Sequence, residues 1–297
     1  DWLTLVANLT GQTDPPTASR VRNGDLTVPD SATVTILTPN SGTGSSVPAV
    51  DGFWITGGIQ QTTPTNINVL TGGTTTPYGG TGAVVTQGGA VYIHGGSTNV
   101  AITNNRIEGN SGSYAGAIRV GTPYANGETG IDAAGTGLTA APSASSLRVS
   151  NQNLVVAHNR ILSNGGANLA GGIGLFSGTY GYRVSWNDVC GNFSAEYGGA
   201  ISHYGLSDNG SIQHNRIWFN ESYDEGGAIM VAGEIPATPD HVSGGAGRVT
   251  IADNKIDENL SNDDGGGIRL LNAGARRILI QNNEIVNNVS AHEGGGI

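Results

Sequence analysis

The stretch NRIWFNESYDEGGAI, from Asn215 to Ile229, contains the repeated pattern that indicates the architecture of the protein. It contains an Asn, a β-branched residue two positions later, a second Asn five positions later, a polar stretch and a glycine-rich block that closes on Ile. Six units of this kind occur in the chain. Their first Asn is Asn105, Asn159, Asn187, Asn215, Asn254 and Asn283, their second Asn is Asn110, Asn164, Asn192, Asn220, Asn259 and Asn288, and their closing Ile is Ile118, Ile173, Ile201, Ile229, Ile268 and Ile297. Uninterrupted units are 28 or 29 residues long, and repeats of this length predict a stacked array.

Apolar columns flank the first Asn of each unit. Three residues before it lie Ile102, Val156, Val184, Ile212, Ile251 and Ile280, and two residues after it lie Ile107, Ile161, Val189, Ile217, Ile256 and Ile285. β-Branched residues at such spacing indicate short strands with one buried face. The two columns are an odd number of residues apart, so the chain must bend near the Asn. Without helical periodicity, the unit predicts one coil of an all-β, right-handed parallel β-helix.

The two Asn columns have a physical explanation in such a solenoid. Stacked amide side chains at a bend can pass hydrogen bonds from coil to coil and satisfy buried polar groups. Asn192, Asn220, Asn259 and Asn288 also begin N-glycosylation triplets, but an inward Asn ladder is the simpler interpretation.

The repeat also sets the domain organisation. Residues 1–48 lack it and are expected to form an N-terminal cap or irregular first coils, whereas residues 49–297 are expected to form the β-helix and to continue beyond 297. Insertions at 121–147, a loop or a degenerate coil, and at 233–246 should leave from the same corner of the coil. Loops on one face of an array often carry binding.

Composition limits the partners. Only 12% of residues are charged, the net charge is -10, Lys255 is the only lysine and Cys190 the only cysteine. An acidic surface of this kind argues against nucleic acid, which requires a basic stripe. No apolar run predicts a transmembrane segment, and one cysteine allows no internal disulfide.

The pairing of Ile217-Trp-Phe-Asn220 with Gly226-Gly-Ala-Ile229 resembles the FxxN and GGAI repeats of chlamydial polymorphic outer-membrane proteins. Similar repeats occur in bacterial surface proteins of the pectate-lyase-like β-helix superfamily. The resemblance covers about residues 85–297, with Ile or Val in place of the Phe. It implies an extracellular or cell-surface solenoid of adhesin type, usually without catalysis.

A set of acidic and aromatic residues precedes the glycine pairs. It contains Glu196, Tyr197, Asp224, Glu225, Asp263, Asp264, His292 and Glu293. Stacking should bring the carboxylates together, where like charges raise a pKa or recruit a cation. Asp224, Glu225, Asp263, Asp264 and Glu293 are therefore a candidate Ca²⁺ site, and Glu196 and Tyr197 candidate ligand-binding residues. A solvated acidic edge is the simpler alternative.

An enzyme is a second interpretation of the same residues. Arg119 and Arg269 follow a closing Ile and should point outward from their strands. Uronan lyases of the resembling superfamily combine Ca²⁺-binding carboxylates with an Arg or Lys base, so Asp224, Asp263 and Arg269 are candidate catalytic residues of a polysaccharide lyase. Asp224 with Asp263 would be the pair to test in a glycoside hydrolase. Both enzyme interpretations are weakened because these residues recur as periodic columns, whereas catalytic residues usually break a repeat pattern.

His158, Trp186 and His214 share the position before the first Asn and should stack on the outer surface, where they could hold a sugar ring or a metal, or simply pack as a turn column. Together, these patterns predict an extracellular or cell-surface structural or adhesive β-helix, with carbohydrate or other copies of itself, stacked end to end, as partners. The alternative is a polysaccharide lyase or glycoside hydrolase.

Overall fold

The computed structural model describes residues 32–36, 47–58, 89–93, 97–112, 114–121, 151–166, 169–233 and 245–297. Most of the proposed cap at 1–48 and the bodies of the insertions at 121–147 and 233–246 lie outside these residues. In the described ranges the secondary structure consists of short strands and turns, with no helix.

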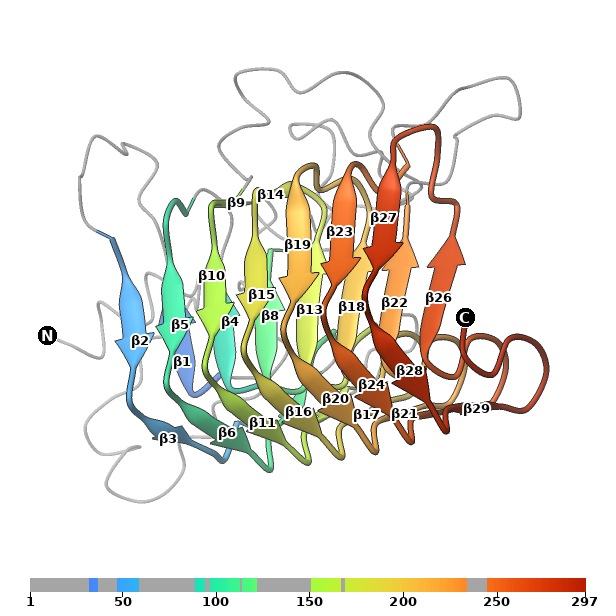
Figure 1. Cartoon of the computed structure of the whole chain (residues 1–297). Coiled ribbons are helices and arrows are strands. Elements are labelled where there is room, and N and C mark those ends of the chain that lie inside the picture. The colour runs from blue at the N-terminus through green and yellow to red at the C-terminus, as the bar shows by residue number, and fades with distance from the viewer. Residues whose placement is uncertain are drawn as a thin grey trace, which may run out of the picture.

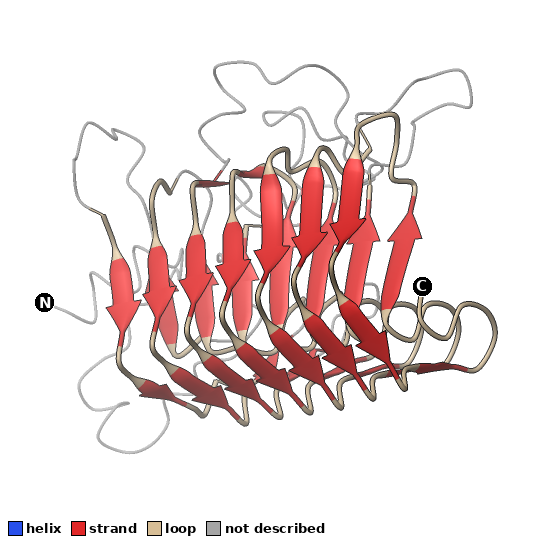
Figure 2. Ribbon diagram, viewed as in Figure 1, coloured by secondary structure: helices blue, strands red, loops and turns tan. Residues whose placement is uncertain are grey.

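Four parallel sheets make up the body of the protein (Figures 1 and 2). Sheet 1 contains β1 (Val34–Ile36), β4 (Val91–Ile93), β8 (Ile118–Val120), β13 (Ile173–Phe176), β18 (Ile201–Tyr204), β22 (Ile229–Ala232) and β26 (Ile268–Leu271). Sheet 2 contains β2 (Ala49–Asp51), β5 (Ala101–Thr103), β10 (Val155–Ala157), β15 (Arg183–Ser185), β19 (Gly210–Gln213), β23 (Val249–Ala252) and β27 (Ile278–Gln281). Sheet 3 contains β3 (Trp54–Ile55), β6 (Arg106–Glu108), β11 (Arg160–Leu162), β16 (Asp188–Cys190), β20 (Arg216–Trp218), β24 (Lys255–Asp257) and β28 (Glu284–Val286).

Sheet 4 is narrower and contains β7 (Ser111–Gly112), β12 (Gly165–Gly166), β17 (Phe193–Ser194), β21 (Glu221–Ser222), β25 (Leu260–Ser261) and β29 (Val289–Ser290). A two-stranded sheet, β9 (Asn151–Gln152) with β14 (Thr179–Tyr180), joins two coils between sheets 1 and 2. The chain visits sheets 1, 2, 3 and 4 in turn and then starts the next coil, so the protein is a right-handed parallel β-helix, as predicted.

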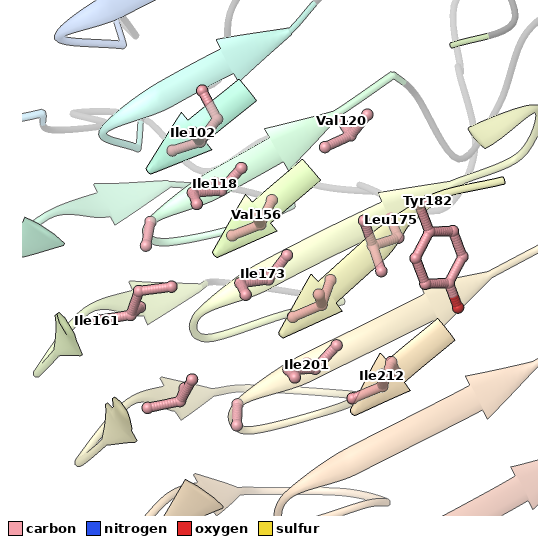
Figure 3. Packing of buried hydrophobic residues seen from close by; sticks show 14 of the residues in the cluster. Ile102, Ile118, Val120, Val156, Ile161, Ile173, Leu175, Tyr182, Ile201 and Ile212 are labelled. Atoms are coloured by element: carbon pink, nitrogen blue, oxygen red, sulfur yellow. The ribbon is translucent and has the colours of Figure 1, made fainter. Parts of the chain in front are cut away.

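The interior of the solenoid is one continuous apolar core. Ile102, Val156 and Ile212 of sheet 2 point toward Ile118, Ile173 and Ile201 of sheet 1, and Ile161 closes the core from sheet 3 (Figure 3). These side chains have no exposed surface. The predicted apolar columns before and after the first Asn are therefore confirmed as the core.

Both Asn ladders are confirmed. In each, Nδ2 donates to Oδ1 of the Asn in the following coil at 2.9–3.0 Å. The ladders pass both insertions, since Asn105 bonds Asn159 and Asn215 bonds Asn254. Asn192, Asn220 and Asn259 are each 1% exposed, so these glycosylation triplets belong to the ladder.

The bends themselves lie one residue before each Asn. The residues at these positions have φ between 52° and 63°, in the left-handed region: Asn104, Gly109, His158, Ser163, Trp186, Gly191, His214, Phe219, Asp253, Glu258, Asn282 and Asn287. The ladder amides make this conformation tolerable at non-glycine residues, because each amide ties the bend to its neighbours.

One polar pair interrupts the apolar core. Tyr182 occupies a column that otherwise holds Leu154 and Val249, and its ring fills the space above Gly210, where an added Cβ would lie 2.2 Å from the ring. The Tyr182 hydroxyl lies 2.8 Å from Nδ1 of His203, which occupies an inward position of β18. Nε2 of His203 lies 2.9 Å from the Gly205 carbonyl and 3.0 Å from that of Ala246, so both ring nitrogens are satisfied.

The insertions leave from a shared corner, as predicted. The described chain stops after Gly121 and after Gly233, each directly following a strand of sheet 1. Gly121 N donates to the Ile93 carbonyl and Gly233 N to the Leu271 carbonyl, at 2.8 Å each.

Within the described ranges, no helix is long and apolar enough to cross a membrane.

Candidate functional site

The acidic residues that precede the glycine pairs lie in the turn that carries the chain from sheet 4 to sheet 1. We call this group the acidic edge. Backbone hydrogen bonds stack the successive turns: Glu225 N donates to the Glu196 carbonyl at 3.1 Å, and Asp263 N to the Asp224 carbonyl at 3.0 Å. Glycine is required just beyond, because a Cβ on Gly227 would lie 2.4 Å from the carbonyl oxygen of the next coil. The turn is thus held against the outer face of sheet 1.

Arg269 is the centre of this edge. Its Nη2 lies 2.8 Å from Oδ2 of Asp264 and 3.4 Å from Oε1 of Glu225, so it bridges two adjacent coils. The other Asp264 oxygen accepts hydrogen bonds from Nδ1 of His292 at 3.0 Å and from the backbone of Glu293 at 3.1 Å. Asp264 is 8% exposed although it is ionisable, and these bonds explain why.

Burial and neighbouring charges shift the pKa values of the carboxyl groups in this turn. Burial raises the pKa of Asp224, and the charges of Asp263 and Asp264 raise it further. Burial also raises the pKa of Glu225, although Arg269 opposes this effect. Burial alone would raise the pKa of Asp264, but the His292 hydrogen bond and the Arg269 charge lower it overall. The predicted crowding of carboxylates is therefore present, and part of it is neutralised by Arg269.

Three side chains approach one another closely enough to hold a metal ion. Their ligand atoms, on Asp263, Asp264 and His292, lie within 4.8 Å of one another. This set contains His292, which the candidate Ca²⁺ site lacked, and does not contain Asp224, Glu225 or Glu293. Ca²⁺ prefers oxygen ligands, whereas this set includes an imidazole and one carboxylate already paired with Arg269. The donors therefore fit Ca²⁺ poorly.

The residues at equivalent positions of the turn between sheets 4 and 1 change from apolar or aromatic to acidic along the solenoid. The residue four positions before each closing Ile is Tyr114, Leu169, Tyr197, Glu225, Asp264 and Glu293. In the earlier coils these side chains cover the outer face of sheet 1 with apolar contacts, since Tyr114, Leu169 and Phe176 form a separate buried cluster. Tyr197 joins it by stacking on Tyr204 with a centroid distance of 6.2 Å. Glu196 lies beside it, and burial together with the Glu196 charge raises the pKa of Tyr197.

The surroundings of Arg119 differ from those of Arg269, because the turn residues change from aromatic to acidic along the solenoid. It points away from the core, as predicted, but it is only 4% exposed. Its guanidinium lies 4.6 Å from the ring centroid of Tyr92 and 5.0 Å from that of Tyr114, and Nε donates to the Gly121 carbonyl. The aromatic turn of this coil covers Arg119, whereas the acidic turn pairs with Arg269.

The predicted stack of His158, Trp186 and His214 forms at the corner between sheets 2 and 3. The Trp186 ring lies 4.4 Å from His214 at 15° and 6.4 Å from His158 at 9°, measured between ring centroids. Because the imidazoles lie on opposite faces of the indole, they cannot share a metal ion. The rings of His158 and His214 lie on either side of Trp186 along the solenoid axis, and Trp186 is 58% exposed.

The candidate catalytic residues are brought together only in part. Asp224 and Asp263 are neighbours in adjacent turns, but the ion pairs of Arg269 are with Asp264 and Glu225. Stacking was expected to bring His292 close to Asp263 and Asp264, whereas its hydrogen bond to Asp264 depends on how the side chain folds toward the previous coil.

No family model, curated protein or solved structure matches this chain.

Proposed function

We propose that this protein is an extracellular or cell-surface β-helix of bacterial origin with a structural and adhesive role, a stalk, sheath or filament subunit that presents glycan-binding surfaces. The resemblance to the pectate-lyase-like superfamily and to polymorphic outer-membrane protein repeats supports this proposal. Copies of the chain, stacked end to end, are further proposed partners.

One observation carries the structural role: the two Asn ladders continue without a break through every described unit. Except in the last coil, each ladder amide is bonded to the coils on both sides, so neighbouring coils cannot separate without breaking buried hydrogen bonds. A solenoid built in this way transmits load along its axis and holds surface residues at fixed spacing.

Single-molecule pulling along the axis tests the structural role. A stalk should resist force and unfold in steps of whole coils, since each coil contacts only its neighbours. Asn192→Ala should lower the force of the steps that involve its coil, while Asn262→Ala, an exposed Asn two coils further along, should leave the force unchanged. Smooth unfolding at low force in the wild-type protein contradicts a load-bearing role.

A second candidate is a polysaccharide lyase or glycoside hydrolase at the acidic edge. It is favoured by the raised pKa of Asp224, caused by burial and by Asp263 and Asp264, because general acids have such pKa values. In addition, Oε2 of Glu225 and Nε of Arg269 are buried without a hydrogen-bond partner in the described part of the chain.

Assays of uronans and neutral glycans separate the two functions. Turnover by the wild-type protein that is lost in Asp263→Asn, with the fold retained, would establish the enzyme and reject a purely structural role. The adhesive proposal expects binding without turnover. Calorimetry with added Ca²⁺ tests the metal, since a bound cation should raise the melting temperature.

A further inference from the structure

Three arginines gather on one corner of an otherwise acidic protein. Arg160 and Arg216 lie on the outer face of sheet 3, one coil on either side of Asp188, and Arg183 lies on the outer face of sheet 2. All three are exposed, and they lie beside the ring stack that contains Trp186. We call these arginines, with His158, Trp186 and His214, the corner patch.

Two acids border the corner patch: Asp188 lies between its arginines on sheet 3, and the exposed Asp253 follows His214 in the column of bend residues. The outward positions of the three coils here, from β10 and β11 to β19 and β20, hold three arginines and Asp188, a formal charge of +2 within a chain of net charge -10. Asp188 is already engaged, since it accepts a hydrogen bond from Nε1 of Trp218 at 2.7 Å and lies 3.9 Å from Arg160. The flanking cations Arg106 and Lys255 have carboxylate partners of their own.

Acidic residues of the same coils lie elsewhere in the cross-section. Asp224 and Glu225 belong to the turn between sheets 4 and 1, which shares no sheet with the corner of sheets 2 and 3. Asp208 lies between sheets 1 and 2 and is paired with Arg248 and Arg276. Because exposed charges are screened within about 8 Å at physiological salt, the corner patch acts on a ligand as a local cation.

The geometry of the rings limits the class of ligand. A nucleobase or an uncharged sugar that binds by stacking needs an open aromatic face. The faces of Trp186 are turned toward His158 and His214, and the face of Trp218 is covered by the Arg216 guanidinium at 3.9 Å. Beside these rings, the exposed guanidinium groups of Arg160, Arg183 and Arg216 offer hydrogen-bond donors to oxyanions.

We propose that the corner patch binds a linear acidic polysaccharide, with its carboxylate or sulfate groups on Arg160, Arg183 and Arg216 and its remaining oxygens at the edges of the ring stack. The chain lies along the solenoid axis, because Arg160 and Arg216 lie two coils apart along it, at about twice the coil spacing of about 4.8 Å, with Arg183 in the coil between them. The proposal rests on the adhesive form of the function above and names its ligand class.

Affinity electrophoresis in Ca²⁺-free buffer tests this site, with alginate as a carboxylated probe, heparin as a sulfated probe, dextran as a neutral probe and a single-stranded oligonucleotide. The wild-type protein should be retarded by alginate or heparin, and less so as salt rises. Arg160→Gln and Arg216→Gln should each weaken binding about fivefold, and the double variant about tenfold or more. Whichever acidic probe binds more tightly identifies the anionic group.

Matched controls come from the same chain. Arg277→Gln removes an exposed arginine outside the corner patch and should change the affinity less than twofold, and Phe219→Ala removes an exposed ring at the next bend as a control for Trp186→Ala. All these positions are exposed, and circular dichroism verifies the fold of each variant.

Three results overturn the proposal: no retardation by either acidic probe, equal losses in Arg216→Gln and Arg277→Gln, or equal or tighter binding of dextran or the oligonucleotide. A protein that withstands axial force but shows any of these results keeps its structural role and loses only this site. A protein that binds alginate through the corner patch but unfolds at low force keeps the site and loses the load-bearing role.

Discussion

The hydroxyl of Tyr182 lies 2.8 Å from Nδ1 of His203, and both side chains are fully buried in the core of the solenoid. Because Nε2 of His203 faces two carbonyl oxygens, it carries the proton, and Nδ1 accepts from the tyrosine. This arrangement fixes a neutral imidazole, and burial lowers the pKa of His203 from 6.5 to about 4.

The pair predicts a pH-dependent stability. The unfolded chain takes up the proton first, so the contribution of His203 is complete above about pH 6.5 and is lost as the pH falls toward 4. The difference between the two pKa values corresponds to about 3 kcal/mol. Urea unfolding between pH 7 and pH 4.5 measures this. His203→Gln keeps a donor and an acceptor without titrating, so it should lose less stability over the same range; parallel profiles for the two proteins would contradict the assignment.

The close packing of the Tyr182 ring over Gly210 gives a second prediction. Gly210→Ala should destabilise the protein by about 1–3 kcal/mol, because the new Cβ would enter the ring of Tyr182. Tyr182→Leu restores the residue type of Leu154 and makes room for the methyl group. In a double-mutant cycle by thermal unfolding, the double variant should therefore cost less than the sum of the single variants, and strict additivity would rule out the exchange.

The ladders predict a large cost for one amide. Asn187→Ala removes its bonds to Asn215 and to the Val156 carbonyl, and leaves the backbone N–H of Asn159 without its acceptor. Buried groups left unpaired in this way should lower the unfolding free energy by about 3 kcal/mol or more. Asn262→Ala, at an exposed position, should change it by less than about 0.5 kcal/mol in the same denaturant titration. Equal effects would mean that the ladder contributes little.

Whole coils should be removable. Asn159, Asn187 and Asn215 are 28 residues apart, so deletion of residues 159–214 joins His158 to Asn215 and removes two coils together with Tyr182, Gly210 and His203. The shortened protein should fold with a β-sheet spectrum and a cooperative melt. Deletion of residues 159–213 leaves one extra residue, which breaks the bend and reverses inward and outward side chains beyond it. If both deletions fold equally well, register does not control the assembly.

Much of the fold could be predicted because the repeat reports it directly. Ile102, Ile107 and Ile118 recur at fixed spacing, and side-chain burial in a solenoid depends only on that spacing. The positive φ at His158 and Trp186 could not be predicted, because only the ladder makes such a conformation acceptable there.

The candidate site was less predictable. Residues of the sheet 4 to sheet 1 turn could be aligned, but whether a carboxylate points to water or to Arg269 depends on how the turn folds over sheet 1. The ring stack of the corner patch was predicted but its arginines were not, because net charge averages over the chain, whereas Arg160, Arg183 and Arg216 come to share one corner only once the coils are stacked.

The ladder amides have a further consequence. In both ladders every Asn donates forward and accepts from behind, from Asn105 to Asn283 and from Asn110 to Asn288. The small dipoles of these amides add up along the axis, which gives the solenoid an intrinsic polarity. Two such solenoids can continue each other's ladders only head to tail, since a head-to-head meeting places like poles and like hydrogen-bonding groups against each other. Any fibre that this chain builds by coil-to-coil contact must therefore grow with a single orientation.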